Sequence, residues 1–208
     1  MSGYSFPTGE AKYAQSFMCL TLAVSTFETV AQSLLVDWPQ IYDSAINAAL
    51  TTKLPSLAAL INGQKTSGAT ATATNITTAG GKPFLVFAKN REWDSYLYTD
   101  LVAPTLNDGL YVESWLNGVG KVGSVCGAYK IFDVLQMSLP DGSSWSVNQD
   151  HSKWAITQQM GWSCVGDINR ESGQTKRGGG TVCTYDSGLW GAFQSTISNV
   201  NKTCGRST

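Results

Sequence analysis

The chain has 208 residues, enough for one domain with a sizeable buried core or for two small domains. Apolar residues make up 42% of it and charged residues 14%, and 14 basic side chains nearly balance 15 acidic ones. This balance excludes a polybasic tail or stripe, the usual mark of electrostatic attachment to nucleic acid or membrane. A nucleic-acid substrate is not excluded, because a catalytic site needs positive charge only locally.

Cysteines and glycosylation sequons indicate an oxidising compartment. The chain has five cysteines, and N-x-[ST] sequons begin at Asn75 and Asn201. The first residues carry no basic segment, and the first apolar run, Phe17 to Val24, is interrupted by Thr and Cys. We therefore expect a secreted or lysosomal protein without a transmembrane span, whose original amino-terminal part is missing from this sequence.

The first third of the chain predicts one strand and several helices. Residues 12–23 mix apolar and β-prone side chains and predict a strand. Ser25 and Glu28 form a capping box ahead of a short amphipathic helix that ends near Asp37. Residues 41–61 have a helical pattern interrupted at Pro55, with Gly63 as a stop. Residues 64–81, rich in Thr, Ala and Gly, predict a loop or an exposed hairpin.

The remaining chain predicts mainly strands and one closing helix. Short runs of β-branched and aromatic residues predict strands at 84–88, 111–115, 129–137, around Lys153, at 160–168 and at 181–184. The charged stretch 89–94 is expected at the surface. Ser187 caps a helix whose apolar side chains, up to Val200, face inward. With no internal repeat or long linker, the sequence predicts one mixed α/β folding unit.

The single histidine is the most informative residue. His151 stands two residues before Lys153, and in an extended strand the two side chains point the same way. An imidazole beside an ammonium group suits a phosphate, because the histidine can exchange a proton or attack while the cation binds the oxygens. The alternative is a half-buried histidine on a sheet with a solvated lysine beside it.

Longer motifs around this tripeptide resemble the deoxyribonuclease II family. They are DHSKW (150–154), WSCVGDINR (162–170), KRGGGTVC (176–183) and LWGAF (189–193). The resemblance continues upstream through YAQSFMCLTL (13–22), the run at 39–43 and FAKNREWDSYLYTDLVAPTL (87–106). It covers nearly the whole chain.

That family is in turn similar to the phospholipase D superfamily, whose site contains two H-x-K segments, each followed by a Gly-[Gly/Ser]-x-Asn turn. His151, Lys153 and Asn169 fall on such positions here, with Asp167 where a small residue is usual. Gln158 stands where the superfamily has an aspartate. The resemblance implies an α/β fold of phospholipase D type: a mixed sheet with flanking helices, its carboxy-terminal half largely represented and its amino-terminal half truncated.

The chemistry implied by the resemblance is metal-independent hydrolysis of DNA phosphodiesters, without a cofactor. One histidine attacks phosphorus, a second protonates the leaving oxygen, and Lys-Asn pairs stabilise the non-bridging oxygens. Since one histidine must be neutral while the other is charged, mildly acidic pH is favoured. The catalytic set in this chain is then His151, Lys153 and Asn169, with Asp167 as a further member.

Half of such a site is absent from this sequence. The family's first H-x-K lies upstream of the region matching residue 13, so we assign His151 to the general-acid role. A homodimer or a missing amino-terminal half would supply the second histidine. We expect residues 1–208 to form a single region of this family, with 1–60 as the end of the amino-terminal half and connecting helices, and 61–208 as the carboxy-terminal half.

The resemblance also implies disulfides Cys164–Cys183 and Cys126–Cys204. The first would clamp the catalytic turn against the triple glycine, and the second would fix the tail. Cys19 is left over; its equivalent in the family pairs with a cysteine absent here. A buried, inert Cys19 is the alternative.

Three basic residues near the triple glycine, Arg170, Lys176 and Arg177, are candidate contacts to DNA phosphates. A surface turn that needs glycine is the alternative for this segment. The tryptophans Trp115, Trp162 and Trp190 follow strand or helix patterns, so we expect them in the core. Lys89 and Arg91 are expected to be solvated.

The resemblance implies a deoxyribonuclease II-type acid endonuclease that leaves 3′-phosphate ends, as members of that family do. The competing hypothesis is a truncated or catalytically silent secreted relative, which binds nucleic acid or a host partner without cleavage. A third hypothesis is a fragment with no stable fold of its own. The missing first H-x-K favours either alternative.

Overall fold

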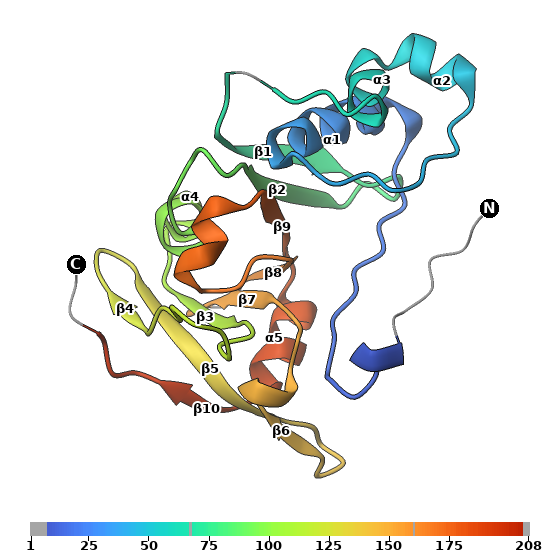
Figure 1. Ribbon diagram of the computed structural model, residues 1–208. Helices are drawn as coiled ribbons and strands as arrows, with labels where there is room; N and C mark the ends of the chain where they lie inside the picture. Colours follow the sequence, from blue (N-terminus) through green and yellow to red (C-terminus); the bar gives the residue numbers. More distant parts are fainter. Residues whose placement is uncertain (1–7, 67, 160, 206–208) are drawn as a thin grey trace.

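The computed structural model describes residues 8–66, 68–159 and 161–205, whose strands join into one ten-stranded sheet (Figure 1). The main path runs β1-β2-β9-β8-β7-β3-β5-β10, and β4 and β6 also pair with β5. Among these pairs, β3 and β5 run parallel and the others antiparallel. The strands are β1 (Ala71–Thr77), β2 (Pro83–Lys89), β3 (Leu110–Glu113), β4 (Val125–Cys126), β5 (Lys130–Ser138), β6 (Ser144–Ser146), β7 (Trp154–Thr157), β8 (Trp162–Gly166), β9 (Gly179–Tyr185) and β10 (Ile197–Asn201).

Across the described ranges, five α-helices and four short helical turns accompany the sheet, so the predicted mixed α/β class is confirmed. The helices are α1 (Val24–Asp37), α2 (Ala48–Lys53), α3 (Pro55–Ile61), α4 (Ala103–Leu106) and α5 (Ser187–Thr196). The turns are η1 (Thr8–Glu10), η2 (Leu97–Val102), η3 (Val147–Gln149) and η4 (Ser172–Lys176). In the described part of the chain, no helix has the length and apolar character needed to cross a membrane.

The strand predicted at residues 12–23 does not form. The segment 11–23, here called the strap, runs extended along the molecule from η1 to α1 (Figure 1). Its backbone pairs with loops instead of a strand edge: Ala14 N–H donates to Gln149 O at 2.9 Å, and Ala79 N–H donates to Thr21 O at 2.8 Å. β-prone residues therefore gave the right backbone conformation without a ladder.

The predicted capping box is also wrong, although α1 ends at Asp37 as expected. Ala23 is the N-cap of α1 and Ser25 lies inside the helix. Glu28 instead accepts hydrogen bonds from the backbone N–H of Ser56 at 3.0 and 3.1 Å, satisfying the first turn of α3. The Glu28 carboxylate, which fits a local capping pattern in the sequence, thus caps the distant helix α3 instead.

The other predictions differ from the structure mostly at element boundaries. The helical pattern at 41–61 forms only as α2 and α3, and residues 64–81 contain β1, so the hairpin alternative is correct. Lys153 precedes β7, and residue 160 of a predicted strand lies outside the described residues. Asp186 caps α5 by accepting from Leu189 N–H at 2.8 Å, and Val200 belongs to β10 instead of the last helix.

The two faces of the sheet bury separate apolar clusters. One face packs against η2 and α4, in a cluster that includes Phe87, Val102 and Ile131. The opposite face packs against α5, whose Trp190 and Phe193 contact a cluster containing Trp154. Helix α1 packs on β1 and β2. Helices on both faces hold the loops at the ends of β7, β8 and β9 in place.

Both disulfides implied by the resemblance are present. Cys164 and Cys183 face each other on β8 and β9, and their bond ties the strand entering the Asp167–Asn169 turn to the strand leaving the triple glycine. Cys126–Cys204 joins β4 to the tail. Cys19 is free and exposed, so the buried alternative is wrong.

Candidate active site

The H-x-K segment lies in the connection between η3 and β7, beside the end of β8. His151 N–H donates to Ala14 O at 2.9 Å, and Gly166 N–H donates to Lys153 O at 2.8 Å. These bonds bring the strap and the glycine turn to opposite sides of the tripeptide. A cavity of about 190 Å³ opens there, lined by Gln15, Ser16, His151, Ser152, Lys153, Gly166 and Asp167.

The imidazole of His151 is held on several sides. Its Nδ1 lies 2.5 Å from Oε2 of Glu10, and the ring stacks on Tyr13 with centroids 4.1 Å apart. Trp115 meets the ring edge-on, with centroids 3.8 Å apart. Nε2 is buried and has no hydrogen-bond partner among the described residues. The ring is therefore fixed through Nδ1 while Nε2 keeps its bonding capacity unused.

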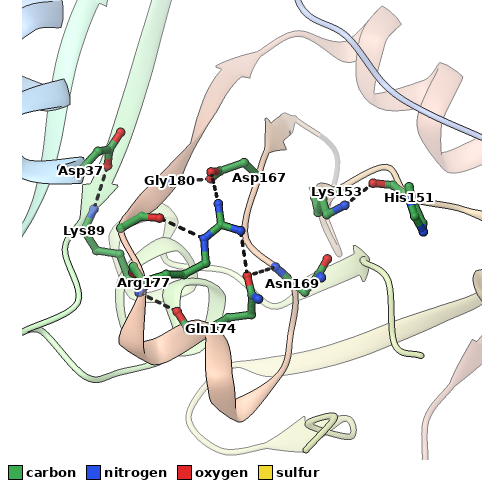
Figure 2. A network of polar contacts seen from close by, with 10 residues as sticks. Asp37, Lys89, His151, Lys153, Asp167, Asn169, Gln174, Arg177 and Gly180 are labelled. Carbon is green, nitrogen blue, oxygen red and sulfur yellow. Dashed lines mark hydrogen bonds and ion pairs between the residues drawn. The ribbon is translucent and has the colours of Figure 1, made fainter. Parts of the chain in front are cut away.

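Lys153 and Asn169 are placed near this histidine without being joined to its ring. The Lys153 ammonium donates to the carbonyl oxygen of His151. Burial lowers the pKa of Lys153, and the nearby Glu113 and Asp150 carboxylates oppose that shift. Asn169 has a buried Oδ1 with no partner among the described residues. In Figure 2 Lys153 lies between Asn169 and His151, and the imidazole is turned away from the amide. Asn169 lines a different cavity from the one that His151 and Lys153 share.

Asp167 organises the triple-glycine turn. Its Oδ1 accepts the backbone N–H of Gly180 at 2.8 Å, and its Oδ2 pairs with Arg177 Nη2 at 2.7 Å (Figure 2). Gly180 needs to be glycine, because an added Cβ would lie 1.9 Å from the Phe87 carbonyl oxygen. Both glycine and aspartate thus serve a close approach between β9 and its neighbours.

Lys89, expected in solvent, is fully buried. Its ammonium donates to three carbonyl oxygens in and after η4: Gln174 at 2.9 Å, Thr175 at 3.2 Å and Arg177 at 2.6 Å. Burial, followed by the Arg177 charge, lowers the pKa of Lys89 to about 8. The lysine acts as a fixed donor that shapes the segment bearing Arg177 (Figure 2).

Asp37 extends this network to the end of α1. Its Oδ1 accepts the backbone N–H of Lys89 at 3.2 Å. Burial and the neighbouring Asp167 charge raise the pKa of Asp37 to about 8. Asp37 also lines a cavity of about 790 Å³ between the strap, α1 and the sheet, which shares Gly166 and Asp167 with the smaller cavity.

Two buried acidic side chains, Asp150 and Glu113, hold the H-x-K segment through hydrogen bonds to Ser152. Asp150 accepts from Ser152 N–H and from Trp145 Nε1, each at 2.7 Å. Glu113 is fully buried; its Oε2 accepts from Ser152 Oγ at 3.1 Å, and its Oε1 has no partner among the described residues. Burial and the Asp150 charge raise the pKa of Glu113 well above its ordinary value.

The three predicted DNA contacts have different environments. Arg170 is 3% exposed and forms a buried ion pair with Asp133, and its Nη2 donates to Gly123 O at 3.0 Å. Its guanidinium is buried and paired inside the fold, so the prediction that Arg170 contacts DNA phosphates is wrong. Lys176 pairs with Asp94 at the surface, and Arg177 is 46% exposed beside Asp167.

The candidate glycosylation sites lie away from this region. Asn75 is exposed on β1, and Asn201 is half-buried at the end of β10, where its Oδ1 accepts from Thr203 N–H at 3.0 Å. Trp115, expected in the core, contacts His151, whereas Trp190 does pack in an apolar cluster. Sequence reasoning missed Glu10, Tyr13, Asp37 and Glu113, since their roles depend on contacts between distant segments.

The arrangement suits the binding of an anion and the transfer of a proton from the imidazole. The half-buried Lys153 ammonium and the His151 imidazole line one cavity, the Asn169 amide lines a different one, and backbone turns are fixed by Asp167 and Lys89. Within the described ranges, no group of three or more His, Cys, Asp or Glu side chains is arranged to hold a metal ion. The fold and site define an α/β protein with an H-x-K pocket.

Comparison with known proteins identifies the family. The model of the Deoxyribonuclease II family matches residues 1–203. Plancitoxin-1 of Acanthaster planci is 34% identical over 198 residues, which cover 93% of this chain and 55% of that protein. Deoxyribonuclease-2-alpha of Mus musculus is 35% identical, covering 93% and 56%, and that of Rattus norvegicus is 34% identical, covering 93% and 57%. The chain belongs to the deoxyribonuclease II family and spans about half the length of these relatives.

Proposed function

We propose that this chain contributes half of an acid endonuclease site that hydrolyses DNA phosphodiester bonds without a metal or other cofactor. The observation that carries the proposal is the cavity shared by His151, Lys153 and the Gly166–Asp167 turn, in a chain of the deoxyribonuclease II family. An imidazole beside a half-buried cation is a combination suited to phosphoryl transfer when no metal neutralises the oxygens.

Each residue has a proposed role. His151 acts as general acid and protonates the leaving oxygen, while Lys153 and Asn169 bind the non-bridging oxygens. Asp167 stays in the proposed catalytic set, acting through the Gly180 amide and Arg177 that it already binds, and not on the phosphate. The exposed cations Lys176 and Arg177 contact the flanking phosphates of the DNA.

The second histidine comes from another polypeptide segment. Because the chain has one histidine, a complete two-histidine site needs either a homodimer or an amino-terminal half. In this proposal residues 1–60 belong to the amino-terminal half and its connecting helices, and residues 61–208 form the carboxy-terminal half. Two histidines in opposite protonation states set a mildly acidic optimum. The bond between phosphorus and the 5′ oxygen breaks, the 5′ oxygen takes the proton, and hydrolysis leaves the phosphate on the 3′ end.

The compartment follows from the covalent chemistry. Two disulfides indicate an extracellular or lumenal protein. We propose secretion or delivery to lysosomes, with glycosylation at Asn75 and Asn201, the first of which is exposed on β1.

One observation favours a silent binder as the second candidate function. The His151 Nε2, which would carry the proton, is buried in this structure. A chain with a covered imidazole and no second histidine can retain DNA through its cations without cutting it.

A plasmid assay separates the two functions. The folded chain is incubated with supercoiled DNA at pH 5 in EDTA, and binding is followed in parallel by gel retardation. Nicking that persists in EDTA and yields 3′-phosphate ends supports the endonuclease. Retardation without nicking supports the silent binder and refutes the proposed activity of the chain by itself.

A further inference from the structure

The contact between Glu10 and His151 is the least expected feature of the site. Glu10 Oε2 lies 2.5 Å from Nδ1 of the imidazole, although the two residues are far apart in the sequence. Backbone bonds hold the strap there: Tyr13 N–H donates to Glu10 O at 3.0 Å, and His151 N–H donates to Ala14 O at 2.9 Å. The carboxylate is therefore delivered by a segment that is itself anchored to the H-x-K backbone.

This contact decides where the imidazole carries its proton. A carboxylate accepts only, so the bond to Glu10 requires a hydrogen on Nδ1. The neutral ring then has its lone pair on Nε2, which has no other partner among the described residues. Stacking on Tyr13 and the edge contact with Trp115 oppose a ring flip, which would replace Nδ1 with a carbon and lose the bond.

The other acidic side chains near the tripeptide are engaged elsewhere. Both oxygens of Asp150 accept hydrogen bonds, one from Ser152 N–H and one from Trp145 Nε1. Glu113 Oε2 accepts from Ser152 Oγ. Glu10 is the carboxylate that the structure places on the imidazole.

We propose that Glu10 is the positioning residue of His151: it fixes the Nδ1–H tautomer and so makes Nε2 the nitrogen that exchanges a proton in the reaction. In carrying a proton to the leaving oxygen, Nε2 cycles between protonated and neutral states while Nδ1 stays hydrogen-bonded to Glu10. The role of Glu10 in catalysis rests on the proposed nuclease function, whereas its orientation of the His151 ring does not depend on that function.

The single histidine makes the orientation directly measurable. In the uniformly ¹⁵N-labelled chain, one imidazole gives all histidine side-chain signals, and its two nitrogen shifts report the tautomer at about pH 8.5, above the ordinary histidine range. We expect the Nδ1–H form to exceed the Nε2–H form by about tenfold, as for a hydrogen bond to a charged group. Glu10→Gln removes this preference, because an amide can donate or accept, and Glu10→Asp retains part of it.

The matched control is Glu92→Gln, which removes an exposed carboxylate elsewhere and should leave the tautomer unchanged. Far-ultraviolet circular dichroism checks that each variant is folded. Equal tautomer populations in the unmodified chain, or an unchanged ratio in folded Glu10→Gln, would overturn the proposal.

An activity measurement then separates the orientation of His151 by Glu10 from the proposed nuclease function. If the chain nicks DNA, Glu10→Gln should lower kcat about tenfold with little change in KM, the low end for such a bond because Glu10 is 41% exposed. An unchanged kcat overturns the positioning role. A Glu10-dependent tautomer in a chain that never cleaves DNA refutes the proposed function and leaves the orientation by Glu10 in place.

Discussion

Replacing Arg170 with alanine should destabilise the fold without weakening DNA binding by the folded protein. The side chain is 3% exposed, and it pairs with Asp133, which is 2% exposed. Truncation leaves that carboxylate without its cation and removes the donor to the Gly123 carbonyl. Removing one partner of a buried ion pair costs about 3 to 5 kcal/mol.

Urea unfolding followed by tryptophan fluorescence measures this loss. At about 2 to 4 °C per kcal/mol for a domain of this size, the midpoint of thermal unfolding should fall by roughly 6 to 20 °C. The control Arg91→Ala, at an exposed position, should change the unfolding free energy by less than about 1 kcal/mol. The double variant Arg170→Met with Asp133→Leu should recover most of the loss, since no charge is left buried.

The reasoning is refuted by a specific combination of results. A loss below about 1 kcal/mol for Arg170→Ala, together with weaker gel retardation of DNA, would mean that the guanidinium reaches the substrate. The buried ion pair would then not describe the protein in solution.

Three further predictions follow from the network around the site. Relative to the unmodified chain, Asp37→Asn should leave the free energy of unfolding unchanged near pH 4 and raise it by up to about 1.4 kcal/mol per pH unit toward pH 8. The reason is that a carboxyl whose pKa is raised by folding stabilises the unmodified chain at low pH, and this contribution is lost as the pH rises to the folded pKa of about 8. A difference in the free energy of urea unfolding that stays flat from pH 4 to pH 8 would contradict this. Lys89→Met, which removes the donor to three carbonyls, should speed tryptic cleavage after Arg177 severalfold in timed digests, and an unchanged rate would show that the lysine does not hold this segment. Trp115→Ala should increase the rate of His151 modification by diethyl pyrocarbonate severalfold, measured by absorbance at 240 nm. A rate equal to that of the unmodified chain would show that Trp115 does not shield the imidazole from the reagent.

Residues whose environment is set by local pattern were predictable from the sequence. The apolar run from Phe84 forms a strand that is largely buried, because five consecutive apolar side chains can be buried on both faces of a sheet. The motif Gly166-Asp167-Ile168-Asn169 forms a turn between strands, and the paired cysteines lie on those strands. Local propensity and the family resemblance agree at these positions.

Residues whose environment is set by distant segments were not predictable. Lys89 is charged and follows a strand, which is typical of the surface, yet three carbonyls from η4 bury its ammonium. Arg170 was assigned to DNA because of its neighbours, and only the fold brings Asp133 to it. Glu10 carries no sequence signal for its contact with His151, because the strap reaches the imidazole through backbone bonds that any residues can make.

The most direct test of the proposed chemistry is the initial rate of plasmid nicking by His151→Ala relative to the unmodified chain, at pH 5 in EDTA. The account predicts a loss of about 100-fold or more, the contribution of a general acid, with gel retardation of DNA preserved. Nicking at an undiminished rate by the folded variant would show that the single histidine does not take part in cleavage.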